Sequence, residues 1–296
     1  MKKVMGNKLS IALFVLPAFL IYFVFALVPI GYNIYMSFFK TDLMSPGRFY
    51  GIKNYVNLMK DKVFFTALRN NFMMVLGSLS AHLVFALLLS AVLFQARTLK
   101  GKGFFQTVYF MPSVLCGVAV GLTWTFIYHG NFGIINQFLN AVGRPDLARV
   151  WLNDKHTAMI CVIVVVMWQF VGYHLIIQLA GMKNIPFELF EAARIDGASS
   201  WGQFRYITLP LLKPILKIDA VLIITGSLKY YDLVSVMTNG GPNHATELMS
   251  TYMFYEGFRQ LKYGYSSAIG LILLLLCMSA VVVSNLLFRT KPVEYD

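Results

Sequence analysis

The side chains best suited to binding or chemistry lie in one polar stretch, residues 186–214, within an otherwise apolar half of the chain. Around Gly197 the stretch carries Glu191, Arg194 and Asp196, which offer charge and hydrogen bonds but pair no nucleophile with a base. The sequence has no GxxxxGK[ST], HExxH or GxSxG motif, and its five histidines are scattered. We therefore predict a docking surface, and we expect no enzymatic activity, catalytic residue, metal site or cofactor of this chain's own.

The pattern of the stretch predicts a short helix, a turn and a second short helix. Gly197 is expected to end the first helix, because glycine reaches the left-handed conformation that commonly closes one. Ser200 and Gln203 form a capping-box pattern for the start of the second helix. Pro210 and Pro214 are expected to limit that second helix.

The first of these helices has the composition of a segment that contacts a partner closely. Pro186 suits its first position, where a fixed φ and a missing N–H cost least. Two aromatic residues would be apolar anchors, and small residues would let a partner approach. The residues that we assign to this contact are Phe187, Phe190, Glu191, Ala192, Ala193, Arg194, Asp196 and Gly197.

The order of these residues resembles the EAA loop of the inner-membrane permease subunits of ABC importers. The letters EAA at 191–193 are followed by Gly197 and then, at the family's spacing, by ITLP at 207–210. Asp196 before the glycine is similar to the carbohydrate-uptake branch, the relatives of the maltose and glycerol-phosphate permeases. In that family the loop, here residues 186–210, is a coupling helix that sits in a groove of a cytoplasmic ATPase subunit.

The same residues also permit a structural interpretation without a partner. Glu191 and Arg194 are spaced to pair at i, i+3 on a solvated amphipathic loop, which stabilises a helix by a few tenths of a kcal/mol. A structural or receptor-like membrane protein would not need a glutamate and a glycine at fixed positions in an inner loop. Substitution of Glu191 without a phenotype would favour that class.

The composition is typical of a protein that crosses a membrane several times. Of 296 residues 58% are hydrophobic and 13% are charged. In soluble domains about a quarter of all residues are charged. The net charge of +12 suggests nucleic acid at first sight, but the basic residues lie mainly between apolar runs. We therefore predict the lipid bilayer, and no nucleic acid, as a partner.

The apolar runs predict an all-α membrane protein with six transmembrane helices and one domain, residues 1–296. The resemblance implies the type I ABC importer permease fold. The fifth span is the least obvious, because Lys213, Lys217 and Asp219 interrupt it, and it crosses only if the lysines reach toward the interface. The predicted spans are residues 10–39, 70–95, 104–128, 157–182, 208–231 and 263–288.

The distribution of basic residues favours both termini in the cytoplasm. With this topology thirteen basic residues face inward and twelve outward, so the totals do not decide. The short inner segments nevertheless carry eight of them, at positions 2, 3, 8, 97, 100, 102, 289 and 291, and short loops are where the positive-inside rule applies. We predict a multi-pass protein of the bacterial cytoplasmic membrane whose coupling loop faces the cytoplasm.

The resemblance also implies partners and a function. Residues 131–139, Trp151 and TNGGP at 238–242 are similar to sugar-permease sequences. Implied are a second homologous permease, two ABC ATPase subunits that hold ATP and magnesium, and an extracellular or periplasmic sugar-binding protein. This chain would be the transmembrane subunit that forms, with the second permease, the pathway for a carbohydrate, with an oligosaccharide favoured.

A sugar pathway requires hydrogen-bonding groups and aromatic faces near the middle of the membrane. Such residues lie on the fourth and fifth spans, where the resemblance implies the sugar contacts. A structural alternative is that the aromatic side chains lie at interfaces and that Gln and His bond neighbouring helices. The candidates are Trp168, Gln169, Tyr173, His174, Ser227, Tyr230, Tyr231 and Asp232.

Two other transport functions stay open at this point. A gradient-driven secondary transporter is expected to bury an ionisable residue at mid-membrane, and here Asp219 comes close, near an inner end. An ABC permease for a solute such as glycerol phosphate would share the coupling loop. Oligosaccharide, polyol and glycerol phosphate all remain candidate substrates.

Overall fold

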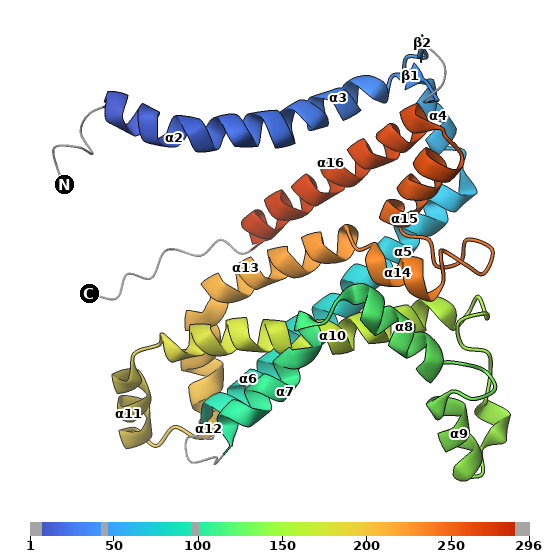
Figure 1. The fold of residues 1–296 in the computed structure, drawn as a ribbon. Helices are drawn as coiled ribbons and strands as arrows, with labels where there is room; N and C mark the ends of the chain where they lie inside the picture. The colour runs from blue at the N-terminus through green and yellow to red at the C-terminus, as the bar shows by residue number, and fades with distance from the viewer. Residues whose placement is uncertain (1–7, 43–46, 96–100, 288–296) are drawn as a thin grey trace. The chain divides into compact units, whose positions relative to one another are not determined.

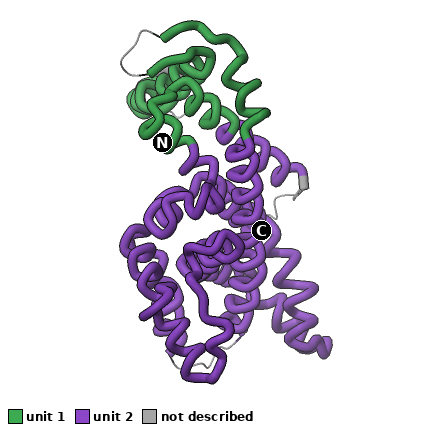
Figure 2. The backbone as a smooth tube through the Cα atoms, turned by 90° about the vertical axis from the view of Figure 1, so that its right-hand side faces the viewer, with its two compact units in different colours: residues 1–61, 253–272 green, residues 62–252, 273–296 purple. Residues whose placement is uncertain are grey.

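The structure is a computed structural model that describes residues 8–42, 47–95 and 101–287, and its elements are almost all helical (Figure 1). They form two compact units, Met1–Asp61 with Met253–Ile272 and Lys62–Tyr252 with Leu273–Asp296 (Figure 2). Six of the basic residues behind the orientation prediction, at 2, 3, 97, 100, 289 and 291, lie outside the described residues.

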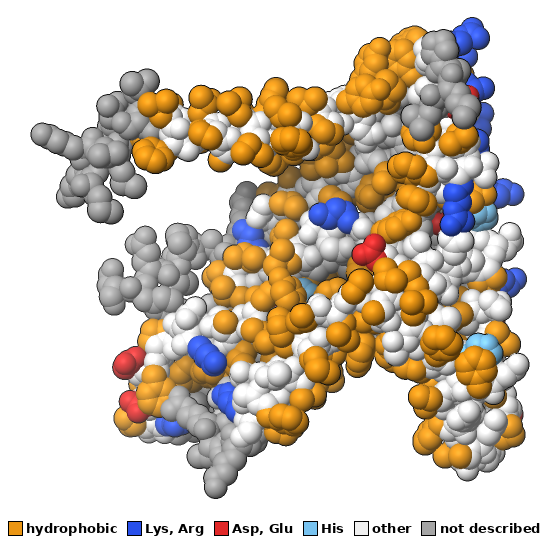
Figure 3. Space-filling model, viewed as in Figure 1, with side chains coloured by type: hydrophobic (Ala, Val, Ile, Leu, Met, Phe, Trp, Pro, Cys, Tyr) orange, Lys and Arg blue, Asp and Glu red, His pale blue; other side chains and the backbone are white. Residues whose placement is uncertain are grey.

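The first unit begins with a long apolar helical run. Helix α2 (Lys8–Tyr22), the π-helical turn η1 (Phe23–Leu27) and α3 (Val28–Met36) follow one another without a break. The π-helical turn comes directly before the turn that holds Pro29, whose ring and missing N–H disturb the hydrogen-bond ladder behind it. Hydrophobic side chains cover this run in Figure 3, as suits a helix surrounded by lipid. The helical run covers the predicted first span, 10–39, except for its last three residues.

A small capping structure completes the first unit. Strands β1 (Phe39–Lys40) and β2 (Arg48–Phe49) pair antiparallel. Asn54, in α4 (Lys53–Leu58), donates to the carbonyls of Ser37 at 2.8 Å and Phe39 at 3.0 Å, and this fixes the chain as it leaves the apolar run. The unit also holds η5 (Tyr255–Arg259) and the first part of α16 (Tyr263–Leu287).

The second unit opens with a longer span than the sequence predicted. Helix α5 (Lys62–Ser78), the π-helical turn η2 (Leu79–Phe85) and α6 (Ala86–Gln95) form one run of 34 residues, Lys62–Gln95. The helix begins eight residues before the predicted start of the span at residue 70. Phe64 and Ala67 are buried while Lys62 and Arg69 are exposed, so an amphipathic turn extends the helix beyond its apolar part.

The predicted third span, 104–128, is broken rather than straight. Helix α7 (Lys102–Val114) and α8 (Gly117–Ile127) meet at an angle of 96°. Pro112 lies inside the last turn of α7, and Leu115 is extended at the break. The Leu115 carbonyl freed there accepts from Gln169 Nε2 at 3.4 Å, which satisfies a backbone group where little water is available.

Helices α10 (Ala158–Lys183) and α13 (Leu209–Leu228) pack together, and α10 also packs against α6 and α7. The bounds of α10 and α13 lie close to those predicted for the fourth and fifth spans. Among the described residues, four helical runs are long and apolar enough to cross a membrane, or five when the bent pair counts as one. Helix α13 is not among them because it carries three charged residues, so the count of six spans stays a prediction.

The TNGGP segment follows α14 (Asp232–Met237) and leads to α15 (Met249–Phe254). Gly240 has a φ of +80°, and a Cβ there would lie 2.2 Å from Oε1 of the buried Glu247. Glu247 accepts from Thr251 Oγ1 at 2.5 Å. The segment therefore needs glycine at 240 in order to fold over a buried carboxylate, a requirement that the sequence alone did not reveal.

Candidate functional site

The stretch predicted to dock a partner folds as a helix, a turn and a helix. Helix α11 (Phe187–Ile195) begins after Pro186, which is the residue before the first turn rather than in it. The Gly197 amide donates to Arg194 O at 3.0 Å and the Ala198 amide to Ala193 O at 2.8 Å. These two bonds and a φ of +79° at Gly197 make a Schellman ending, as the glycine predicted.

The second helix begins one residue earlier than expected and runs much further. Ser199 Oγ, not Ser200, accepts from the Gly202 amide at 3.2 Å and caps α12 (Ser200–Gln203). The prediction that prolines limit this helix is wrong, because the π-helical turn η4 (Phe204–Thr208) continues directly into α13. Pro210 lies in the first turn of α13, where a missing N–H is tolerated, and Pro214 lies inside the helix.

Helix α11 is anchored to its own chain by one of its two predicted aromatic anchors. Phe190 is 4% exposed, and its ring lies 5.5 Å from the ring of Phe94, near the end of α6. Gln95 Nε2 also donates to the Ser200 carbonyl at 3.2 Å. Phe190 is therefore not available to a partner, contrary to our expectation, because its own unit buries it.

The exposed face of α11 differs in part from the set that we predicted. Glu191, Ala192, Arg194, Asp196 and Gly197 are exposed, while Phe187 and Ala193 are half-buried. Acidic and basic side chains gather over this helix in Figure 3. Sequence analysis missed four exposed apolar side chains beside them, which a search for apolar residues in a polar loop would have found: Leu189, Ile195, Trp201 and Tyr206.

We predict that Phe190→Ala releases α11 from the unit. A buried Phe→Ala change costs about 3–5 kcal/mol in a soluble core, so the amides of α11 are expected to exchange with deuterium much faster. Hydrogen exchange of the purified protein measures this. Leu189→Ala is the matched control, because Leu189 is 42% exposed on the same helix and its loss is expected to leave exchange nearly unchanged. Equal exchange in both variants would contradict the anchoring role.

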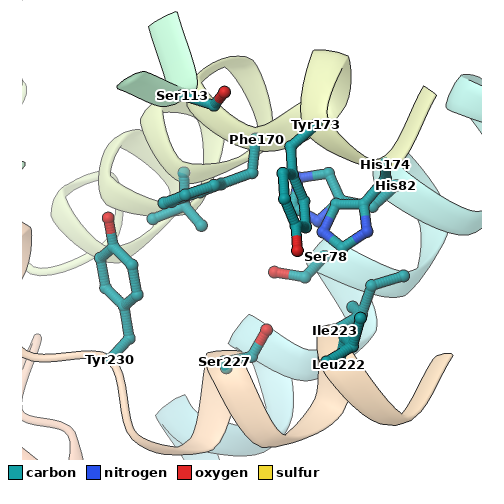
Figure 4. Close-up of a pocket in the computed structure, with 12 residues that line it drawn as sticks. Ser78, His82, Ser113, Phe170, Tyr173, His174, Leu222, Ile223, Ser227 and Tyr230 are labelled. Atoms are coloured by element: carbon teal, nitrogen blue, oxygen red, sulfur yellow. The ribbon is translucent and has the colours of Figure 1, made fainter. Parts of the chain in front are cut away.

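A second site is a cavity of about 300 Å³ inside the second unit (Figure 4). Its wall comes from α5, η2, α7, α10 and α13 and from Tyr230, two residues after the end of α13. Hydroxyl, imidazole and aromatic groups share the wall with aliphatic side chains, as in sites for small polar molecules. The lining residues are Ser78, His82, Ser113, Val166, Phe170, Tyr173, His174, Leu222, Ile223, Gly226, Ser227 and Tyr230.

Four of the eight candidate pathway residues line this cavity: Tyr173, His174, Ser227 and Tyr230. Gln169 lies just behind the wall and accepts from the Tyr230 hydroxyl at 3.1 Å. The other three are not in the wall. Trp168 packs edge-on against Trp124, with ring centroids 5.4 Å apart, while Tyr231 is half-buried and Asp232 is exposed.

The sequence search missed the contribution of the second and third spans. Ser78 and His82 are polar residues four apart in an apolar run, a spacing that places both on one helix face. Ser113 reaches the cavity because it lies next to the break between α7 and α8. The first of these signals was readable in the sequence, whereas the second depends on the unpredicted bend.

A buried polar cluster supports the cavity wall. His174 Nδ1 lies 2.6 Å from Asp219 Oδ1, and Gln178 Nε2 donates to Asp219 Oδ2 at 2.7 Å and to the His82 carbonyl at 2.9 Å. The imidazole rings of His82 and His174 stack with centroids 4.7 Å apart. Asp219 is fully buried, and these partners explain how an apolar helix accommodates its carboxyl group.

The cavity and the predicted docking segment, residues 186–210, are joined through the chain. Helix α10, which contributes His174 and Tyr173 to the cavity, ends just before α11. Helix α13, which contributes Ser227, continues from α12 without a loop. The segment is therefore continuous in the chain with two of the helices that form the cavity.

Comparison with known proteins identifies the architecture. The model of the family described as "Binding-protein-dependent transport system inner membrane component" matches residues 101–291, which contain the docking segment and most of the cavity. The chain belongs to this family. It is thus a membrane protein and a component of a transport system, as the EAA resemblance implied.

Individual proteins also resemble the chain over nearly its whole length. The probable ABC transporter permease protein YurN of Bacillus subtilis is 37% identical over 97% of this chain and 99% of its own. The lactose transport system permease protein LacF of Rhizobium radiobacter is 32% identical over 89% of each. A chain of a solved bacterial ABC transporter involved in alginate import has the same fold, with a TM-score of 0.84 at 22% identity over 98% of this chain and 99% of that one. The predicted permease fold is confirmed.

Proposed function

We propose that this chain is a transmembrane permease subunit of an ATP-driven ABC importer that takes up a carbohydrate. The observation that carries the proposal is the exposed, glycine-terminated helix α11, which is placed between the two helices that supply most of the cavity wall. A helix in that position receives force from a soluble partner and passes it to the substrate path. Family membership supports the same function.

The partners follow from this arrangement. Two ABC ATPase subunits bind ATP and magnesium, and each one grips the coupling helix of one permease. A second homologous permease completes the pathway, and an external binding protein delivers the substrate. Both termini and α11 face the cytoplasm, in accord with the basic residues in the short inner segments of the sequence.

Closure of the ATPases on ATP would move α11 as a rigid piece. To reverse a population from 1:99 to 99:1 requires about 5.5 kcal/mol of differential binding. Phe190 holds α11 on Phe94 while α10 and α13 leave from either side of the segment, so the motion rotates both helices together. The cavity between them would then open to one side of the membrane at a time.

A carbohydrate is the substrate class best supported by the chemistry of the cavity. Sugars present hydroxyl groups to hydrogen bonds and CH faces to aromatic rings, and both kinds of group occur in the wall. The name of the relative LacF, a lactose transport permease, points the same way. An oligosaccharide is favoured because the family's relatives include transporters of disaccharides.

A gradient-driven transporter is the second candidate, and one observation favours it. Asp219 is fully buried against His174, and such pairs form proton relays in some transporters. The exposed coupling helix has no role in that mechanism, so the two candidates differ in their partners.

The test is a pull-down from the native membrane in mild detergent, followed by mass spectrometry. We expect an ABC ATPase and a second permease to co-purify with the chain in near-equal amounts. Gly202→Ala, a small change within α12, is the control and is expected to leave their recovery unchanged. A chain that emerges alone, together with uptake that a protonophore abolishes in liposomes lacking ATP, would refute the ABC function and establish the gradient-driven one.

A further inference from the structure

The polar cluster behind the cavity determines which ligands the cavity accepts, an inference that rests on the proposed function. We propose that the cavity binds an uncharged polyhydroxy ligand, and that Asp219 is the specificity-determining residue that makes it reject anionic ligands such as sugar phosphates and uronates. This choice separates the neutral sugars and polyols from glycerol phosphate, which the sequence left open.

The charge of the cavity wall is the first support. Of the described residues, twelve line the cavity and none of them is Lys or Arg. Proteins that bind phosphate or carboxylate groups normally use the guanidinium of Arg or the ammonium of Lys, which form charge-assisted hydrogen bonds. An anion in this cavity would lose its hydration without meeting a compensating cation.

Asp219 adds negative charge directly behind that wall. Its carboxylate oxygens accept from His174 Nδ1 at 2.6 Å and from Gln178 Nε2 at 2.7 Å, and its side chain is fully buried. Even when His174 carries a second proton, the pair has no net charge. The His174–Asp219 pair is therefore neutral or negative, and in its negative state it disfavours an anion nearby.

Each of the two imidazoles has a ring nitrogen that can accept a hydrogen bond from a ligand hydroxyl group. His174 donates through Nδ1 to a carboxylate, and His82 Nε2 lies 3.3 Å from the Met167 carbonyl, which accepts only. In each neutral ring the other nitrogen is then an acceptor. A sugar hydroxyl can donate to such a nitrogen, whereas a phosphate or carboxylate oxygen cannot.

Ser78 gives an independent indication that a polar ligand enters. Its Oγ is buried, lines the cavity and has no hydrogen-bond partner among the described residues. Figure 4 shows this hydroxyl directed toward the open centre of the cavity, between the hydroxyl of Tyr173 and that of Ser227. A buried hydroxyl without a partner is costly, and a ligand hydroxyl would satisfy it as donor or acceptor.

The test compares ligands that differ by one charge. The permease pair with its ATPases, without the external binding protein, is placed in nanodiscs with and without a non-hydrolysable ATP analogue. Binding is measured by calorimetry for methyl glucoside against methyl glucuronide, for the same galactose pair, and for glycerol against glycerol 3-phosphate. We expect the neutral member of at least one pair to bind about tenfold or more tightly than its anionic counterpart, because a buried charge acts strongly over several ångströms.

The variants assign the effect to Asp219. Asp219→Asn is expected to reduce the preference in affinity for the neutral over the anionic ligand to about threefold or less. Asp219→Glu, which keeps the charge, is expected to retain the wild-type preference. Ser78→Ala is expected to lower the affinity for the neutral ligand. In that background Asp219→Asn is still expected to reduce the preference for the neutral over the anionic ligand. Asp146→Asn is the charge control, because Asp146 is 60% exposed in the short 3-10 helix η3 (Pro145–Leu147), outside the cavity.

The outcomes separate this inference from the proposed function. If the wild type binds the uronide or phosphate as well as the neutral member, or if Asp219→Asn keeps the wild-type preference in a folded complex, the inference is overturned and carbohydrate import stands. If neither member of any pair binds in either nucleotide state, the inference is overturned as well, and the pull-down described above decides the proposed function separately.

Discussion

Replacement of Gly197 by valine is expected to reduce substrate uptake at least about tenfold while the chain still inserts into the membrane. Gly197 has a φ of +79°, and a Cβ there would meet no atom of the described residues within 4 Å. The effect is therefore one of backbone conformation and not of crowding. A β-branched residue in the left-handed region costs about 1–2 kcal/mol or more, so the Schellman ending of α11 would unwind and α11 would lose its position relative to α12.

Two control variants isolate that cause. Gly197→Asn is expected to keep most of the uptake, because asparagine tolerates the left-handed conformation. Gly202→Ala adds a methyl group within α12, at an ordinary 3.5 Å from Ser199 Oγ, and is expected to transport normally. Uptake of a radiolabelled substrate by cells, normalised to the permease in their membranes, measures all three. Wild-type uptake in the valine variant would rule out a coupling role for this helix ending.

The coupling segment could be predicted from the sequence because its signals are local. Glycine at a helix end and the composition of residues 186–198 act over a few residues, so α11 and its ending were correct. The error in the cap is local and small, Ser199 instead of Ser200, but the local pattern did not predict that the second helix continues through Pro210 and Pro214. The direction of Phe190 was not predictable in this way, because its partner Phe94 lies almost a hundred residues earlier.

Only part of the cavity wall could be predicted from the sequence, because the packing of helices brings its lining residues together. His174 and Ser227 were found from polar residues in apolar spans, but their neighbours Ser78 and Ser113 come from other helices. A hydropathy pattern contains no information about which helices touch. Nor does it reveal the 96° break that brings Ser113 to the wall.

Close approach of helices depends on glycines that the sequence analysis passed over. A Cβ on Gly77 would lie 2.6 Å from Ile163 Cγ2, and one on Gly181 2.7 Å from Leu212 Cδ1. Membrane helices pack through such small residues, since no hydrophobic effect drives them together inside lipid. Glycine is also common in spans that need none, so its type alone does not identify a contact.

Gly172→Ala is expected to destabilise the protein more than any other single-methyl change at a helix crossing. A Cβ at 172 would lie 1.8 Å from the carbonyl oxygen of Tyr109 and 2.2 Å from its carbonyl carbon. Overpacking usually costs about 1–3 kcal/mol when side chains can move. Here the obstacle is the backbone of α7, so α7 and α10 must separate, and we expect a cost of about 3 kcal/mol or more.

Thermal unfolding of the purified complex measures this change, with Gly226→Ala as its matched control. Gly226 lies inside α13, and an added Cβ would meet no atom of the described residues within 4 Å, so that variant is expected to be as stable as the wild type or up to about 1 kcal/mol more stable. Equal melting temperatures for the two variants would contradict the close crossing. Because α7 carries Ser113 and α10 carries His174, separation of these helices would also widen the cavity. The Gly172→Ala variant is thus expected to bind ligand more weakly even at temperatures where it remains folded.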